Sequence, residues 1–127
     1  MNYSFRKKNK KVKYIVIHYT GMESLSRAIS KLNNLNSDVS CHYLISKSGL
    51  IFNLLCPSFK AWHAGKSQWK DLNNLNDYSV GIELENKGHN HGYDNFSSKQ
   101  YSSLKKLITF LNKNFQIQHQ NIIFHSD

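Results

Sequence analysis

The run Tyr14-Ile15-Val16-Ile17-His18-Tyr19-Thr20 constrains the fold of this chain more than any other stretch. A continuous apolar run of this length is typical of a β-strand that is covered on both faces. The run ends on His18, and a histidine at the end of such a strand can point into a cleft while its backbone stays in the sheet. We therefore predict a strand over residues 12–19 that presents His18 to a cleft.

Two other strand-like runs carry a histidine or a carboxylate that could bind a metal ion or transfer a proton. Ile122-Ile123-Phe124-His125 repeats the first design near the end of the sequence and predicts a strand over 121–125. Val80-Gly81-Ile82-Glu83-Leu84-Glu85 predicts a strand over 79–85 with Glu83 between apolar neighbours. Two histidines at strand ends and one carboxylate on a strand suggest a zinc hydrolase.

The remaining pattern alternates between strands and helices. Apolar residues at helical spacing predict a helix over 24–32, and Gly49 between two apolar runs predicts a β-hairpin with strands 42–46 and 50–54. Ser97 begins a capping box that opens a longer helix with an apolar stripe. Together these elements predict an α/β fold, a mixed central β-sheet flanked by helices.

The segments between these elements are polar. Residues 66–77 are expected to be irregular, with one helical turn around Trp69, and residues 86–95 to form a surface loop. A chain of 127 residues is long enough for one domain with its own core. We expect a basic N-terminal arm over residues 1–11 and a single domain over 12–127.

The charge and the cysteine content argue against several classes of protein. The formal net charge is +9, concentrated in Arg6-Lys7-Lys8-Asn9-Lys10-Lys11, which favours an anionic partner or a solvated arm. No aromatic residues interleave with that basic run, so we expect no nucleic-acid binding. Two cysteines without a CxxC pair exclude a disulfide framework and argue against cysteine-based zinc binding. No run has transmembrane length.

A catalytic zinc site needs about three protein ligands and one open position. His18 and His125 can supply two ligands, and Glu83 can act as the base. No short motif such as HExxH supports this assignment, and a histidine on a strand is also a common structural residue. Glu83 and Glu85 share one face of their strand, which either is solvated or lines a polar cleft.

Other residues have two interpretations each. Trp62 and His63 can form a substrate wall, with the indole stacking on a sugar ring; the alternative is that Trp62 is a loop residue that caps the core. His42 is expected in the core or close behind a site rather than as a ligand. Cys41 would need a neighbouring base to act as a nucleophile, and Cys56 is expected to be a packing residue.

Five blocks of the sequence resemble one enzyme family. In order, they are Ile15-Val16-Ile17-His18-Tyr19-Thr20, Ser40-Cys41-His42-Tyr43-Leu44-Ile45, Ala61-Trp62-His63-Ala64-Gly65, Leu75-Asn76-Asp77-Tyr78-Ser79-Val80-Gly81-Ile82-Glu83-Leu84-Glu85-Asn86 and His125-Ser126-Asp127. They resemble the zinc-dependent N-acetylmuramoyl-L-alanine amidases related to peptidoglycan recognition proteins and phage lysozyme-type amidases. The blocks follow the family's order and cover nearly all of the chain after residue 12.

The resemblance implies a fold, a reaction and a set of residues. It implies a Zn²⁺ ion above the sheet and hydrolysis of the amide between N-acetylmuramic acid and L-alanine in peptidoglycan or muropeptides. By motif position, His18 and His125 would bind the zinc and Glu83 would activate the water. Trp62 and His63 would lie along the substrate groove, with His42 close behind the site.

The resemblance breaks off at Asp127, which matches the last residue of the fifth block. The family continues with a segment similar to Arg-Lys-x-Asp-Pro-Gly, which carries the third zinc ligand and a lysine near the oxyanion. We therefore expect an amidase domain that is incomplete at its C-terminal end. The alternative is a peptidoglycan-binding module of the same fold with impaired catalysis.

We also expect a monomer. Since no signal peptide is recognisable, the expected location is the cytoplasm, or the periplasm if a signal has been lost.

Overall fold

The computed structural model describes residues 2–6, 11–22, 24–37, 39–63, 75–87 and 95–124. The strands are β1 (Tyr3–Phe5), β2 (Tyr14–Tyr19), β3 (Tyr43–Ile45), β4 (Ile51–Asn53), β5 (Phe59–Ala61), β6 (Ser79–Leu84) and β7 (Ile122–Phe124). The helices are α1 (Leu25–Asn33) and α2 (Ser98–Phe115), with short 3₁₀ helices η1 (Leu75–Tyr78) and η3 (His119–Asn121). The turn expected around Trp69 and most of the loop expected over 86–95 lie outside the described residues.

Five strands form a mixed sheet in the order β4-β3-β6-β2-β7. The pairs β2–β6, β2–β7 and β3–β6 are parallel, and the hairpin pair β3–β4 is antiparallel. The mixed sheet predicted from the hairpin is confirmed. In the central pair, His18 of β2 lies directly across from Glu83 of β6. Residues that were expected to carry chemistry are therefore neighbours at the carboxyl ends of two parallel strands.

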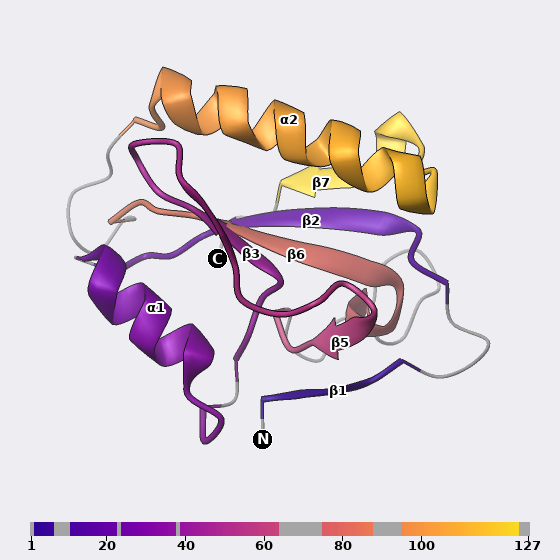
Figure 1. The fold of residues 1–127 in the computed structure, drawn as a ribbon, viewed down its shortest axis with the longest axis horizontal. Helices are drawn as coiled ribbons and strands as arrows, with labels where there is room; N and C mark the ends of the chain where they lie inside the picture. Colours follow the sequence, from indigo (N-terminus) through magenta and orange to yellow (C-terminus); the bar gives the residue numbers. More distant parts are fainter. Residues whose placement is uncertain are drawn as a thin grey trace.

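Helix α2 covers one face of this sheet (Figure 1). It begins with the predicted capping box, in which the Ser97 hydroxyl accepts from the Gln100 amide and the Gln100 side chain accepts from the Ser97 amide. Its buried stripe packs against alternate residues of β2 and β6. The residues of this cluster include Ile15, Ile17, Ile82, Leu84, Leu104, Leu107 and Leu111. Because Ile15 and Ile17 face α2, His18 faces the other side of the sheet.

Helix α1 lies on that other side (Figure 1). Ser24 caps its first turn, and its buried residues Ala28 and Leu32 pack against Leu44 of β3. Leu44 is the register partner of Glu83, so it lies on the same face as the carboxylate. Leu44, Glu83 and His18 are neighbours across β3, β6 and β2, and helix α1 lies over the sheet face that carries them.

The prediction of a basic arm over residues 1–11 is wrong for the part that the structure describes. Tyr3–Phe5 is a strand that pairs antiparallel with β5, and neither short strand has an alternation that a sequence pattern could reveal. Asn2 is buried, and its side-chain amide donates to the carbonyl oxygens of Leu32 and Val39. The first residues are therefore part of the packed domain.

Arg6 holds this small sheet to the main body. Its guanidinium donates to four carbonyl oxygens, those of Pro57, Asn76, Asp77 and Ser79, at 2.7–3.1 Å. Burial lowers the pKa of Arg6 to about 10, with the charge of Asp77 opposing that shift, so the group stays protonated at neutral pH. Arg6, the first residue of the basic run, therefore stabilises the backbone of η1 where it leads into β6.

Replacing Arg6 with methionine should lower the free energy of unfolding by about 2 kcal/mol, because the carbonyl oxygens lose a charged donor. Methionine keeps much of the apolar stem, so the loss reports mainly on the hydrogen bonds. Denaturant unfolding of Arg6→Met and of Lys11→Met, a change at an exposed residue, tests this expectation. Equal stability of the two variants would contradict it.

Neither of the two described α-helices has the length and apolar character that crossing a membrane requires.

Candidate active site

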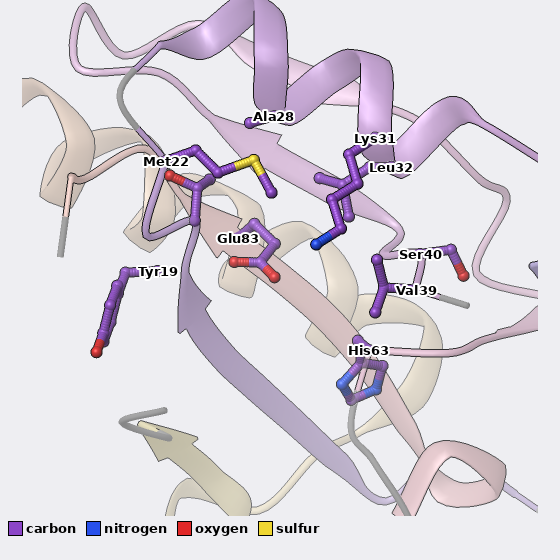
Figure 2. A pocket seen from close by; sticks show the side chains of 10 residues that line it. Tyr19, Met22, Ala28, Lys31, Leu32, Val39, Ser40, His63 and Glu83 are labelled. Carbon is purple, nitrogen blue, oxygen red and sulfur yellow. The ribbon is translucent and has the colours of Figure 1, made fainter. Parts of the chain in front are cut away.

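A pocket of about 160 Å³ opens between α1 and the sheet. Figure 2 shows Glu83 and His63 on the sheet side, and Met22 and Lys31 reaching in from the side of α1. The full set of lining residues is Tyr19, Thr20, Met22, Ala28, Lys31, Leu32, Val39, Ser40, His63 and Glu83. The pocket therefore has an apolar wall, a polar floor and a cation at its rim.

Glu83 reaches the pocket because of its place on β6. Strand alternation puts Ser79, Gly81 and Glu83 on one face, while Val80, Ile82 and Leu84 face α2. The prediction left open whether the face shared by Glu83 and Glu85 is solvated or lines a cleft. Glu83 is partly buried and lines the pocket, whereas a Glu85 carboxylate oxygen accepts from the backbone amide of Lys47. The two carboxylates thus have separate roles.

His18 lies beside the pocket and is almost fully buried, with 2% of its surface exposed. Its Nε2 is 3.0 Å from Nδ1 of His63, and the two rings meet edge to face. His63 in turn places its Nε2 2.7 Å from the hydroxyl of Ser79. The sequence predicts a place for His63 along a substrate groove, and the structure in addition connects it to the candidate ligand His18.

Gly81 makes this position of His63 possible. A Cβ atom on Gly81 would lie 2.4 Å from Cγ of His63, closer than two such carbons can approach. The imidazole therefore rests directly on the strand backbone. The sequence pattern gives Gly81 and Ser79 only as members of the predicted strand and assigns neither a place at the site. The sequence signal that could have revealed this contact is the pair of small residues, Ser79 and Gly81, on the same strand face as Glu83.

His42 lies close to His63, with ring centres 6.4 Å apart. Its Nδ1 accepts from the backbone amide of Gly81, and its Nε2 donates to the carbonyl oxygen of Phe59. Burial lowers the pKa of His42 to about 4; the bond to Phe59 opposes this shift and the charge of Arg6 adds to it. His42 is thus a neutral structural residue beneath the site.

The buried His42 should make the fold sensitive to acid. Between pH 6.5, its ordinary pKa, and about 4, the unfolded chain binds a proton that the folded chain excludes. Stability is therefore present above pH 6.5 and is lost as the pH falls towards 4, by up to about 1.4 kcal/mol per pH unit. Denaturant unfolding at pH 7 and pH 5 measures this loss. In His42→Gln, which has no such group, the difference between the two pH values should shrink.

The remaining candidates occupy varied positions. The indole of Trp62 is half-buried and donates to the hydroxyl of Ser4 in β1. Cys41 is fully buried, and burial together with the charge of Glu83 raises the pKa of its thiol, which disfavours a nucleophilic thiolate. Cys56 is exposed rather than packed. His125 lies outside the described residues, and within the described ranges no three His, Cys, Asp or Glu side chains gather as a metal site.

Comparison with known proteins identifies the family. The sequence model for N-acetylmuramoyl-L-alanine amidase matches residues 8–127. AmiD, an N-acetylmuramoyl-L-alanine amidase of Escherichia coli K12, is 31% identical over 129 aligned positions, which cover 92% of this chain and 46% of AmiD. The 1,6-anhydro-N-acetylmuramyl-L-alanine amidase AmpD of Haemophilus influenzae is 34% identical over 90 positions, 70% of this chain and 47% of AmpD.

Solved structures agree with this. AmpDh3 of Pseudomonas aeruginosa, in complex with anhydromuramic pentapeptide, superposes with a TM-score of 0.82 at 28% identity, covering 96% of this chain and 55% of that chain. AmiD of Escherichia coli, in complex with anhydro-N-acetylmuramic acid-L-Ala-D-γ-Glu-L-Lys, gives 0.80 at 29% identity, with 94% and 51% covered. The chain spans about half the length of the curated relatives it matches first. With its mixed sheet, its flanking helices and a sequence match over nearly its whole length, this chain belongs to the N-acetylmuramoyl-L-alanine amidase family.

Proposed function

We propose that this chain hydrolyses the amide bond between N-acetylmuramic acid and L-alanine in muropeptides, with zinc as its cofactor. One observation carries the proposal: His18 and Glu83 lie across from each other at the carboxyl ends of two parallel strands, beside a pocket of about 160 Å³. Ligand sites of open sheets with parallel strands form at this edge. Membership of the amidase family supports this reaction for the arrangement.

The proposed zinc ligands are His18 and His125. Imidazole nitrogen is a preferred zinc ligand, and a hydrogen bond on the other ring nitrogen usually holds such a ligand in place. His18 fits this description because its Nε2 is bonded to His63. His125 follows Phe124 directly in the sequence, and Phe124 is the register partner of Ile17, the residue before His18.

Glu83 is the proposed general base. Its carboxylate lines the pocket, where it can take a proton from a water molecule that attacks the amide carbonyl. The same carboxyl group then gives this proton to the nitrogen of the departing L-alanine. A bound zinc ion would supply Lewis acidity, polarising the carbonyl and making the water a stronger nucleophile.

The rest of the pocket suits a short peptide attached to a sugar. Met22, Ala28 and Leu32 offer an apolar wall to the methyl groups beside the scissile amide. Lys31, whose ammonium group points into the pocket, can face a carboxylate of the peptide (Figure 2). Trp62 is proposed to stack on the sugar ring.

Incubation of the chain with anhydro-N-acetylmuramoyl-L-Ala-D-γ-Glu-L-Lys and zinc tests the proposal. We expect release of the free tripeptide, loss of that release with a chelator and recovery when zinc is added back. Tight binding of the muropeptide without release at any zinc concentration would overturn the hydrolase assignment. That result would identify the chain as a peptidoglycan-binding module.

A further inference from the structure

Four groups on the sheet side of the pocket form one continuous series of hydrogen bonds. Nε2 of His18 meets Nδ1 of His63 at 3.0 Å, Nε2 of His63 meets the Ser79 hydroxyl at 2.7 Å, and that hydroxyl meets the carbonyl oxygen of Leu75 at 2.7 Å. Leu75 begins η1 and Ser79 begins β6, so this series of hydrogen bonds ends on the backbone of two elements of the packed domain.

When both imidazoles are neutral, the direction of every hydrogen bond in this series follows from its last member. The carbonyl oxygen of Leu75 can only accept, so the single hydroxyl proton of Ser79 is donated to it. The Ser79 oxygen must then accept a proton from Nε2 of His63. A neutral imidazole carries one N–H, which leaves Nδ1 of His63 as an acceptor for the N–H on Nε2 of His18.

The same reasoning fixes the state of His18. With its proton on Nε2, the neutral ring of His18 carries its lone pair on Nδ1. A metal ion binds only a ring nitrogen that has no proton. The tautomer of His18 is therefore set by a backbone carbonyl oxygen two side chains away.

The ring of His63 is held in one orientation, so it can fix the tautomer of His18. Its Cγ lies over Gly81, where even a methyl group would collide with it. The backbone amide of Gly81 donates to His42, and the carbonyl oxygen of Ser79 accepts from Arg6, so the strand beneath the ring is itself fixed. A 180° flip of the imidazole would put Cδ2 and Cε1 in the places of Nδ1 and Nε2, and would break the hydrogen bonds to His18 and Ser79.

We propose that His63 is a positioning residue: together with Ser79 it locks His18 in the tautomer whose Nδ1, rather than Nε2, is offered to the metal. The proton arrangement follows from the heavy-atom geometry for neutral imidazoles. Its link to zinc rests on the proposed function. Metal affinity then depends on Ser79 and His63 as well as on the proposed ligands themselves.

Nitrogen NMR of the metal-free, ¹⁵N-histidine-labelled chain at pH 8 tests the proton arrangement directly, because protonated and unprotonated ring nitrogens resonate far apart. The signals of His18 are assigned by their absence in His18→Gln. We expect the proton on Nε2 in both His18 and His63. A proton on Nδ1 of His18 would overturn the proposal.

Two variants test whether His63 and Ser79 cause this state. Ser79→Ala removes the acceptor for His63, so His63 and then His18 should become mixtures of tautomers. His63→Gln keeps one acceptor and one donor, and should leave His18 as in the parent chain. Ser103→Ala is the matched control, since it also removes a hydroxyl bonded to a backbone carbonyl oxygen, that of Gly49, far along the chain from His63.

Zinc titration against a chromophoric chelator provides the second measurement. Loss of a group that orients a metal ligand typically lowers affinity ten- to a hundredfold, and we expect a loss of this size in Ser79→Ala and none in Ser103→Ala. Unchanged tautomers and unchanged affinity in Ser79→Ala would overturn the role of His63. If the tautomers behave as expected but the parent chain neither binds zinc nor releases peptide, the proposed function fails while the proton arrangement stands.

Discussion

Replacing Glu83 with glutamine is expected to lower the rate of muropeptide hydrolysis by about two to four orders of magnitude, the usual contribution of a positioned general base. The change keeps the size and shape of a side chain that lines the pocket and removes its ability to take a proton. Because the effect is on proton transfer, kcat should fall far more than KM rises. Steady-state release of free tripeptide measures both constants.

The matched control is Glu85→Gln, the same change two residues along the chain. Glu85 accepts from the Lys47 amide through an oxygen that glutamine also has, so its fold contact is kept. We expect near-parental kinetics for Glu85→Gln and an unchanged zinc affinity for both variants. A Glu83→Gln chain that retained the full zinc-dependent rate would remove Glu83 as the base.

Replacing Gly81 with alanine is expected to be the most damaging single methyl addition near the site. The new Cβ would lie 2.4–2.8 Å from three carbon atoms of His63, so the imidazole must move. Overpacking of this kind typically costs about 1–3 kcal/mol of stability. The displaced ring would lose its bonds to His18 and Ser79, and misplacement of a catalytic group by about 1 Å can cost on the order of a hundredfold in rate.

A double-mutant cycle isolates the cause. His63→Ala removes the two closest carbon contacts of the new methyl group, those at 2.4 and 2.6 Å. In that background Gly81→Ala should cost at least about 1 kcal/mol less than in the parent chain, since residues in contact are commonly coupled by such amounts. Denaturant unfolding of the four proteins gives the coupling, and strict additivity would show that the imidazole is not what the methyl group meets.

The strands and helices with a regular apolar pattern were predictable from the sequence. The apolar run of β2, the capping box of α2 and the alternation in β6 each place their residues on defined faces, and the structure confirms them. These signals succeed because burial of one or both faces of an element leaves a regular pattern of apolar residues in the sequence. The same pattern put Glu83 and Glu85 on a common face, but only the packing shows that Glu83 alone lines the pocket.

The small sheet and the support of His18 were not predictable in this way. The strands β1 and β5 have three residues each, and Tyr3 pairs with Ala61 across most of the N-terminal half of the chain. No local pattern records such a pairing. The contact between His63 and His18 likewise depends on the space above Gly81, which is a property of the assembled sheet.

The position of β2 in the sheet has a consequence for synthesis of the chain. Both neighbours of this strand, β6 and β7, come much later in the sequence, so β2 leaves the ribosome long before either partner exists. Pairings of this range slow folding and leave an apolar β-forming segment open to wrong partners. Charged residues beside such a segment discourage association, and the lysines from Lys7 to Lys13 stand directly before it. We therefore expect these lysines to reduce wrong association of β2 while the chain is being synthesised.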